Sequence, residues 1–333
     1  MTLSFWRYAH LALALFSSIF LLLASVTGII LAIDAVQEKS LPYKAEDFNK
    51  ITLGETLPIL KKVYPEITEL SVDYNQFVTL QAIDQDGNDV KAYIDPKTGK
   101  TLGTPAKKTE FINWITSLHR SLFLHEAGRF FVGVISFCLF LISISGFVLV
   151  LKRQRGIRNF FSKIIKEYFA QYYHVLLGRL ALIPILIISL TGTYLSLERF
   201  NFFMGEEKTK PVKTELSDKA KTTSIFNTTL LSDVKKIEFP FTDDPEEYYI
   251  IELKDREVEV NQVTGVVISE KLSPMRSQFA ALSLDLHTGR INGIWAAILA
   301  IACINILFFI YSGFAITLKR RSSRIKNKFK ASE

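Results

Sequence analysis

The residues of this chain that are best able to do chemistry are histidines near the ends of long apolar stretches. An imidazole at membrane depth is costly to leave without a partner, so each of these histidines is a candidate functional residue. Four of the five histidines are followed along the chain by a hydroxyl residue and a glycine. The four combinations are His10 with Thr27-Gly28, His174 with Thr191-Gly192, His119 with Ser145-Gly146 and His287 with Ser312-Gly313.

Four apolar stretches must position these histidines, and each is long enough to span a bilayer, which takes about 20 residues. We predict the spans at 11–33, 130–151, 176–197 and 291–318. Before the first span the only charged side chain is that of Arg7, and the span lacks a small-residue cleavage site. We therefore expect a retained helix rather than a removed signal peptide.

The distribution of charge orients these helices. The net charge of +7 comes from basic clusters after the second and fourth spans, whereas 31 of the 33 acidic residues lie in the segments 34–127 and 198–290. Short basic loops stay in the cytoplasm. Both termini are therefore predicted to be cytoplasmic, in the inner membrane of a bacterium, with the two larger segments in the periplasm. The basic excess is explained by this orientation and does not indicate nucleic-acid binding.

Residues 1–155 and 165–321 read as two copies of one unit. Each copy runs from helix to extramembrane segment to helix to basic stop, and the final helices end alike, with SGFVLVLKRQR at 145–155 and SGFAITLKRRS at 312–322. Because each copy crosses the membrane an even number of times, the copies are parallel. The predicted fold is a membrane protein with an all-α four-helix transmembrane core from two parallel repeats and two small α+β extramembrane domains.

The predicted boundaries follow this plan. Inside the extramembrane domains we expect a helix at 55–67 and a less evident one at 224–234, with short strands around both. The order is the first membrane helix at 1–39, the first domain at 40–110, the second membrane helix with a preceding periplasmic helix at 111–155, a cytoplasmic amphipathic linker at 156–173, the third membrane helix at 174–200, the second domain at 201–275, the fourth membrane helix with its preceding helix at 276–319, and a basic cytoplasmic tail at 320–333.

This topology sorts the histidines into two layers. His10 and His174 begin helices that enter from the cytoplasm, whereas His119, His125 and His287 precede or open helices that enter from outside. We predict that His10 and His174 hold an inner haem, and that His287 holds an outer haem with either His119 or His125. Alignment of the repeats favours His119, and His125 stays an alternative. Two axial imidazoles leave the iron without an open position, which suits electron transfer.

Glycines and arginines accompany the histidines. Five full helical turns place Gly28 on the face of His10 and Gly192 on the face of His174, about 27 Å further along. A missing side chain there either lets a flat ring lie against the backbone or allows close helix packing. Arginines near each histidine either bind haem propionates or anchor helix ends at lipid headgroups. These arginines are Arg7, Arg179, Arg120, Arg129 and Arg290.

Three parts of the sequence resemble PepSY-associated transmembrane proteins. They are WRYAHLALALFSSIFLLLASVTGIILA in the first helix, the segment LHRSLFLHEAGRFFVG, and the strand and turn AYIDPKTGKTLG. The resemblance covers almost the whole chain, and the family includes iron-regulated inner-membrane proteins and ferric-siderophore reductases. It implies a four-helix membrane core, PepSY domains outside the membrane and, in the reductase members, two b-type haems.

With this resemblance, we expect an oxidoreductase that reduces a ferric siderophore in the periplasm to release ferrous iron. A cytoplasmic donor or a quinol would supply the electrons, the lipid bilayer would surround the core, and no catalytic residue is expected beyond the haem ligands. One alternative is a haem-free PepSY regulatory or scaffold membrane protein with interfacial histidines. Another is a membrane haem subunit that passes electrons to a separate periplasmic reductase.

Overall fold

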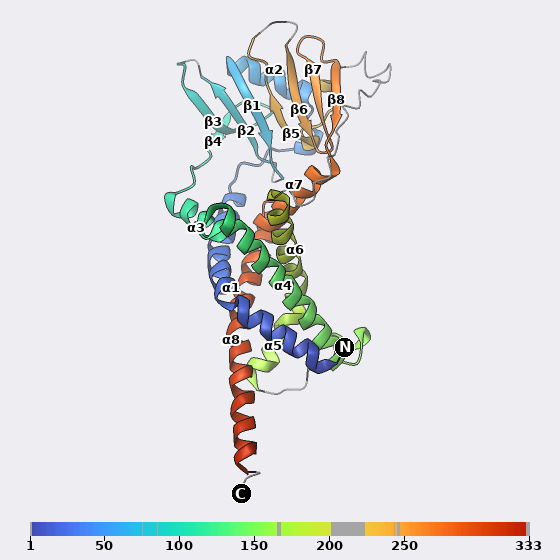
Figure 1. Ribbon diagram of the computed structural model, residues 1–333. Coiled ribbons are helices and arrows are strands. Elements are labelled where there is room, and N and C mark those ends of the chain that lie inside the picture. The colour runs from blue at the N-terminus through green and yellow to red at the C-terminus, as the bar shows by residue number, and fades with distance from the viewer. Residues whose placement is uncertain are drawn as a thin grey trace. The chain divides into compact units, whose positions relative to one another are not determined.

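The computed structural model describes residues 2–74, 76–84, 86–164, 168–200, 224–242, 244 and 247–330. The chain divides into two compact units. A helical unit comprises Met1–Lys39, Lys108–Phe203 and Ala280–Glu333, and a sheet unit comprises Ser40–Lys107 and Met204–Phe279. Figure 1 labels the helices and strands of both units.

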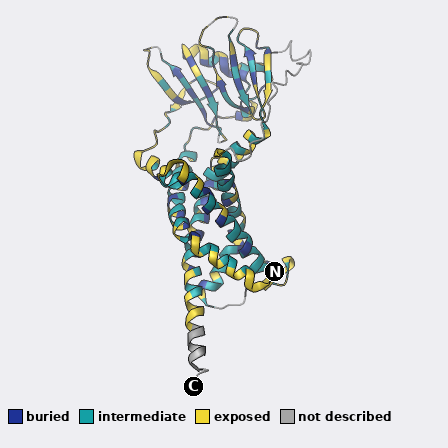
Figure 2. Cartoon of the chain, viewed as in Figure 1, coloured by how far each residue is buried: buried dark blue, intermediate teal, exposed yellow. Residues whose placement is uncertain are grey.

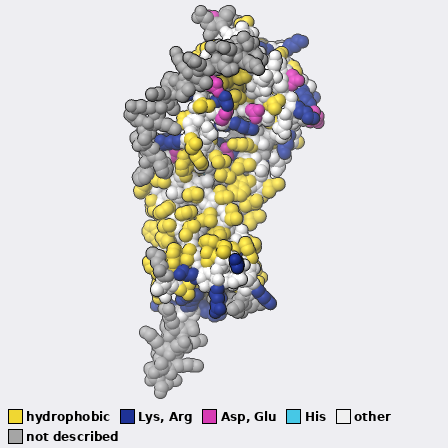
Figure 3. All heavy atoms as spheres, turned by 90° about the vertical axis from the view of Figure 1, so that its right-hand side faces the viewer, with side chains coloured by type: hydrophobic (Ala, Val, Ile, Leu, Met, Phe, Trp, Pro, Cys, Tyr) yellow, Lys and Arg dark blue, Asp and Glu magenta, His cyan; other side chains and the backbone are white. Residues whose placement is uncertain are grey.

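The helical unit is built on four long apolar helices. Candidate membrane spans lie in Leu3–Lys39, His125–Arg153, Leu182–Arg199 and Gly293–Ser322, which confirms the prediction of a multi-pass membrane protein. Hydrophobic side chains cover the outer surface of these helices, as a bilayer requires (Figure 3). The helices of the unit are α1 (Leu3–Lys39), α3 (Glu110–Ser121), α4 (His125–Arg153), α5 (Phe169–Leu180), α6 (Leu182–Arg199), α8 (Gly293–Lys330) and most of α7 (Met275–Thr288).

A small interior core joins these helices. Helix α1 packs against α8 and α4, and α4 packs against α6. Buried aliphatic side chains from α1, α4, α6, α8 and the residue before α6 meet in one cluster, and the serines and threonines buried among the helices bond to backbone carbonyls. Figure 2 shows that buried residues occupy the inward sides of the helices, while most of the surface is exposed or half-buried. The cluster consists of Leu21, Ile135, Ala181, Ile185, Ala302 and Ile306.

The third membrane helix differs from the prediction of one continuous helix at 174–200. Helix α5 ends at Leu180 and α6 begins at Leu182, with Ala181 between them. The cause is Pro184, whose ring lacks an N–H and clashes with the carbonyl one turn earlier, at Leu180. The proline therefore separates the part that carries His174 from the membrane span that follows.

In the sheet unit all the described strands belong to one eight-stranded sheet. The order is β4-β3-β2-β1-β5-β6-β7-β8, and every neighbouring pair is antiparallel. Strands β1 and β5 therefore lie at the centre of the sheet, and the later strands of each segment follow in sequence toward the two edges. The strands are β1 (Glu66–Val72), β2 (Val78–Ile83), β3 (Asp89–Ile94), β4 (Thr101–Gly103), β5 (Val234–Glu238), β6 (Tyr248–Leu253), β7 (Arg256–Asn261) and β8 (Val267–Leu272).

One hydrophobic core serves this whole sheet. Alternate residues of the strands, such as Leu80 and Ile251, are fully buried and pack with the apolar side of helix α2 (Leu53–Val63). Helix α2 confirms the predicted helix at 55–67 over residues 55–63. It begins at a capping box formed by Thr52 and Glu55, and it ends before Pro65, since Glu66 already begins β1. The sequence treats 40–110 and 201–275 as two domains, but the described strands of both segments share this sheet and this core.

The structure differs from the prediction in the segments 224–234 and 156–173. The predicted helix at 224–234 is wrong, because this segment holds only the short 3-10 turns Ile225–Asn227 and Leu231–Asp233 before β5 begins. The β-branched and asparagine residues of this stretch favour turns and strands over an α-helix. The predicted linker at 156–173 begins with a 3-10 turn at Ile157–Asn159 and ends in α5, and its residues 165–167 lie outside the described part.

Candidate functional site

Two pairs of histidines face one another in the helical unit. His10 of α1 lies opposite His174 of α5, with ring centroids 6.4 Å apart and planes at 75°. His119 of α3 lies opposite His287 of α7, with centroids 6.3 Å apart and planes at 49°. We call these the inner pair and the outer pair. Each pair takes one histidine from the first half of the chain and one from the second.

The separation of the rings is that of two imidazoles on opposite sides of one metal ion. A five-membered ring with bonds of about 1.35 Å places each nitrogen about 1.15 Å from the ring centre. With a metal–nitrogen bond of about 2.0 Å on each side, the two ring centres lie about 6.3 Å apart. The angle between the planes is free in such an arrangement, since both planes contain the metal–nitrogen axis. Both pairs match this spacing.

Hydrogen bonds fix which nitrogen of each inner ring carries the proton. His10 Nδ1 lies 3.1 Å from the carbonyl oxygen of Ile142 and 2.9 Å from Ser145 Oγ. The Ser145 hydroxyl donates to the same carbonyl oxygen at 2.9 Å, so it accepts a hydrogen bond from the ring. His174 Nδ1 bonds to Ser312 Oγ at 2.7 Å, and this hydroxyl donates to the carbonyl of Phe309 at 3.3 Å. Nδ1 of His10 is therefore a donor, and Nδ1 of His174 is a donor in the tautomer that leaves the Ser312 hydrogen on the Phe309 carbonyl.

The outer rings follow the same rule with threonine in place of serine. His119 Nδ1 lies 2.8 Å from Thr27 Oγ1, and that hydroxyl donates to the carbonyl of Leu23 at 2.8 Å. His287 Nδ1 lies 3.1 Å from Thr191 Oγ1 and 3.1 Å from the carbonyl oxygen of Ile188. A carbonyl only accepts, so Nδ1 of His287 carries the hydrogen, and Nδ1 of His119 does so in the tautomer that leaves the Thr27 hydrogen on the Leu23 carbonyl.

Once Nδ1 carries the hydrogen, Nε2 of each neutral ring presents a lone pair. None of the hydrogen bonds that these rings make within the described residues involves Nε2. The four rings are half-buried, and histidine is the commonest metal ligand in proteins. Metal-bound histidines characteristically donate the other ring N–H to an oxygen acceptor, as all four do here.

Three of the four glycines that follow these hydroxyls lie against an imidazole edge. A Cβ atom at Gly192 would lie 2.9 Å from Cε1 of His287, and one at Gly146 would lie 3.3 Å from Cε1 of His10. At Gly28 the distance to Cε1 of His119 is 3.6 Å, with Cys303 Sγ nearer at 3.0 Å. Nothing lies within 4 Å of such an atom at Gly313. The space that Gly28 and Gly192 leave is thus occupied by the outer histidine rings.

The donor set fits haem better than a bare metal ion. Within the described residues no group of three or more His, Cys, Asp or Glu side chains stands ready to hold a metal. An ion such as zinc takes three or four protein ligands, whereas a haem iron takes four nitrogens from its porphyrin and needs only two axial ligands. A site with two opposed imidazoles and no third donor matches the second case.

Comparison with family models supplies the identity of this chain. The model of the PepSY-associated TM region matches residues 6–320, which include all five histidines and overlap all four membrane spans. The chain belongs to the PepSY-associated TM family. A comparison with curated proteins finds no relative that matches it.

The fifth histidine of this PepSY-associated TM protein lies apart from the pairs. His125 is the first residue of α4. Its side chain is exposed, and its backbone has a positive φ of 50°. No histidine ring lies opposite it among the described residues. Of the two alternatives for the outer ligand, the structure places His119 opposite His287.

The predicted arginines have different surroundings. Arg7, Arg120 and Arg290 are exposed. Arg129 is half-buried and lies 3.5 Å from the Glu126 carboxylate.

Arg179 is the most buried of the five arginines, with 6% of its surface exposed. Its Nη1 donates to the carbonyl of Ser162 at 2.8 Å, and its guanidinium lies over the ring of Phe160. Nε and Nη2 have no hydrogen-bond partner among the described residues. Such a group is well suited to bind a carboxylate with two N–H donors. Arg179 is therefore the strongest of the predicted propionate partners.

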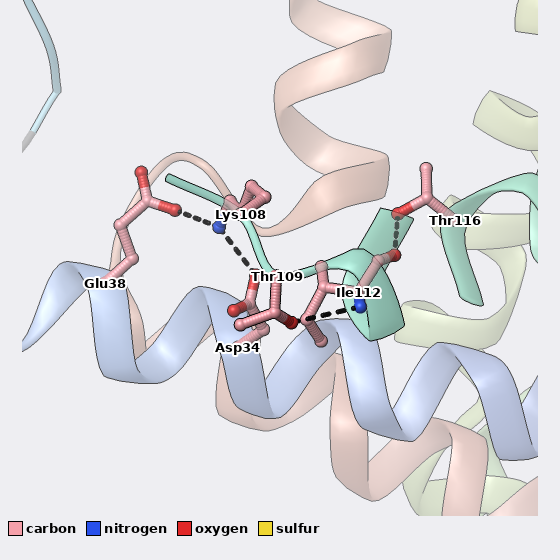
Figure 4. Close-up of polar contacts among 6 residues, drawn as sticks. All are labelled: Asp34, Glu38, Lys108, Thr109, Ile112 and Thr116. Atoms are coloured by element: carbon pink, nitrogen blue, oxygen red, sulfur yellow. Dashed lines mark hydrogen bonds and ion pairs between the residues drawn. The ribbon is translucent and has the colours of Figure 1, made fainter. Parts of the chain in front are cut away.

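Helix α3, which carries His119, is fixed at its start to the end of α1. Lys108 Nζ lies 2.6 Å from the Asp34 carboxylate and 2.7 Å from that of Glu38, one helical turn further along α1 (Figure 4). The next residue, Thr109, caps α3 by accepting a hydrogen bond from the Ile112 N–H at 3.2 Å. We call Lys108, Asp34 and Glu38 the clamp of α3.

Four candidate site residues were not predicted from the sequence, namely the hydroxyls that are hydrogen-bonded to Nδ1 of the paired histidines. Their position before each glycine was evident, but the sequence suggested only helix packing or space for a flat ring. The signal that could have identified them is the constant hydroxyl itself, since packing alone would accept alanine at these positions. These residues are Thr27, Ser145, Thr191 and Ser312.

Proposed function

We propose that this protein is a transmembrane electron conduit with two b-type haems, one held by each histidine pair. The observation that carries the proposal is the geometry of four neutral imidazoles in two opposed pairs, each with Nδ1 bonded and Nε2 without a hydrogen bond among the described residues. A bound haem supplies one-electron transfer between its ferric and ferrous states.

The side chains of the protein have three tasks in this proposal. The histidines would hold the haem iron, one from each half of the chain, and the haem would then supply electron transfer rather than oxygen binding. The hydroxyls hold the imidazoles in one tautomer and orientation. Arg179, five residues after His174 in α5, has two buried nitrogens without a hydrogen-bond partner among the described residues, which suits a carboxylate. All three tasks favour outer-sphere electron transfer over chemistry at the iron itself.

Two parallel repeats explain why the pairs are built alike. His10 bonds to Ser145 as His174 bonds to Ser312, and His119 bonds to Thr27 as His287 bonds to Thr191. Each bond stays within one half of the chain, while each pair joins the two halves. The sheet order, symmetric about the border of β1 and β5, supports the same duplication and two PepSY-like halves.

We further propose that the electron acceptor is a ferric siderophore in the periplasm of a bacterium. The segments before α3 and before α7 share one sheet, which supports placing both on the same side of the membrane, and the basic clusters support a cytoplasmic location for both termini. A cytoplasmic donor or a quinol supplies one electron for each ferric ion. The resulting ferrous ion is held less tightly by hard oxygen ligands and is released.

The test begins with the full chain purified in detergent from haem-replete cells. We expect a pyridine haemochrome assay to give two haem b per chain and the dithionite-reduced protein to show sharp low-spin α and β bands. The reduced protein is then mixed anaerobically with a ferric siderophore, and reoxidation of the haems is followed together with trapping of ferrous iron by a chelating dye.

Each outcome separates the candidate functions. Two haems and rapid reoxidation with release of ferrous iron support the conduit to iron. Two haems without reoxidation instead favour a membrane subunit that passes electrons to another periplasmic reductase. A colourless protein that does not bind added haemin refutes the haem proposal and favours a haem-free regulatory or scaffold role.

A further inference from the structure

The serine and threonine hydroxyls at the histidine pairs are each bonded on two sides. Each receives the Nδ1 hydrogen of an imidazole, and each donates its own hydrogen to a backbone carbonyl about one turn earlier in its helix. For Ser145 and Ser312 these carbonyls belong to Ile142 and Phe309. Because the hydroxyl hydrogen is already used by the helix, the oxygen presents a lone pair to the ring. The hydroxyl is therefore a fixed acceptor rather than a freely rotating group.

The two ligands of the inner pair are not held equally. His10 Nδ1 has two acceptors, Ser145 Oγ at 2.9 Å and the Ile142 carbonyl at 3.1 Å. His174 Nδ1 has a single acceptor among the described residues, Ser312 Oγ at 2.7 Å. Loss of the Ser145 hydroxyl leaves His10 a backbone carbonyl to which it can donate. Loss of the Ser312 hydroxyl leaves the half-buried Nδ1–H of His174 without a hydrogen-bond partner among the described residues, which is unfavourable.

We infer that Ser312 is the dominant positioning residue of the inner haem, and that Ser145 is a lesser one backed by the Ile142 carbonyl. This inference rests on the proposed function. Donation from Nδ1 to an oxygen makes an imidazole a more basic ligand and fixes the rotation of its ring. A more basic axial ligand stabilises ferric iron over ferrous iron. Removal of the Ser312 hydroxyl therefore raises the midpoint potential of the inner haem and lets the His174 ring rotate.

The experiment compares Ser312→Ala with Ser145→Ala in the full chain purified with its haem. Ser312→Thr is the matched control, since it keeps the hydroxyl and reproduces the residue type that the outer pair uses. Potentiometric titration measures the midpoint potential of each haem, and electron paramagnetic resonance of the ferric protein reports the orientation of the axial rings. A His174→Ala variant identifies which signals belong to the inner haem.

We expect Ser312→Ala to shift the inner potential upward and to alter the inner resonance, with the outer haem unchanged. Ser145→Ala should give a smaller shift in the same direction, and Ser312→Thr should match the wild type. If Ser312→Ala instead loses the inner haem, retention of that haem in Ser145→Ala supports the same ranking. Equal effects, a larger effect of Ser145→Ala, or an unchanged potential in Ser312→Ala would overturn the inference while the two haems of the wild type leave the proposed function standing.

Discussion

The inner and outer histidine pairs reach the same ring separation by different structural means. The inner ligands come from α1, which itself contains a membrane span, and from α5, which is followed directly by α6. The outer ligands come from α3 and α7, two helices of 12 and 14 residues that precede the spans in α4 and α8. The inner geometry therefore depends on the packing of membrane helices, and the outer geometry depends on how two short helices are attached.

Identifiable contacts hold the ends of the two short helices, α3 and α7. A turn with positive φ at Leu122 and Phe123 separates α3 from α4, and the clamp of Lys108 fixes the start of α3. The end of α7 is fixed by Trp295, whose Nε1 donates to the Leu286 carbonyl at 2.8 Å. The comparison teaches that contacts outside the membrane spans can tune the outer pair without changing the inner pair.

The largest expected effect is loss of one haem when one ligand is removed. His174→Ala should leave the inner haem with one axial ligand and reduce the content to about one haem b per chain, while His119→Ala should do the same at the outer pair. His125→Ala is the control and should keep both haems, since its side chain is exposed and apart from the pairs. The pyridine haemochrome assay measures this content. Loss of haem in His125→Ala with retention in His119→Ala would reverse the assignment of the outer ligand.

A smaller effect is expected when an outer ring is crowded. In Gly192→Ala the new Cβ would lie 2.9 Å from Cε1 of His287 and 2.5 Å from Ser136 Oγ, so the ring must move. Gly313→Ala adds the same atom where nothing lies within 4 Å. We expect Gly192→Ala to lower the occupancy of the outer haem or broaden its resonance, and Gly313→Ala to leave both haems unchanged. Equal behaviour of the two variants would show that these glycines do not make room for the rings.

The smallest effect is expected at the clamp. Lys108→Met removes two half-exposed ion pairs, each worth about 1 kcal/mol or less. It should shift the potential of the outer haem slightly and leave the inner haem unchanged. Lys107→Met is the control, because the described residues offer Lys107 no ion-pair partner. A shift confined to the inner haem would contradict the separate attachment of the two pairs.

The clamp also predicts a pH dependence. Burial lowers the pKa of Lys108, but the hydrogen bonds and charges of Asp34 and Glu38 together raise it by more, so the net direction is upward. A lysine with a raised pKa contributes stability below its ordinary pKa and loses it as the pH rises through the raised value. The outer potential should therefore be insensitive to Lys108 titration at neutral pH and change only in strongly alkaline solution. Lys108→Met should lack this alkaline change.

Much of the fold was predictable because apolar length and strand alternation are local signals. The four spans, helix α2 and most strands follow from them. The break at Ala181 was also encoded locally, by Pro184, but the apolar run around it concealed the effect. The pairing of β1 with β5 was not predictable in this way. Residues such as Leu70 and Ile237 are far apart in the sequence, and the local sequence of each strand does not indicate its partner.

In the candidate site, too, some features follow from local sequence patterns and others depend on contacts between distant residues. The spacing of His10 and His174 before their glycines predicted that they act together, and the structure places their rings 6.4 Å apart. The choice between His119 and His125 needed coordinates, because both precede the same span and only the turn at Leu122 and Phe123 separates them. The serine and threonine partners were missed because a hydroxyl before a glycine is common in membrane helices for reasons of packing alone.

The central position of the β1 and β5 pairing has a consequence for biogenesis. Strand β1 emerges early in synthesis, yet its partner β5 follows only after two more membrane spans have been made. During that interval β1 is an open edge strand that exposes unpaired backbone groups and invites aggregation. A nascent chain halted between α6 and β5 would carry half of the sheet with β1 unpaired on one side, so prompt synthesis of the second segment, or a chaperone that shields the first, becomes a condition for productive assembly.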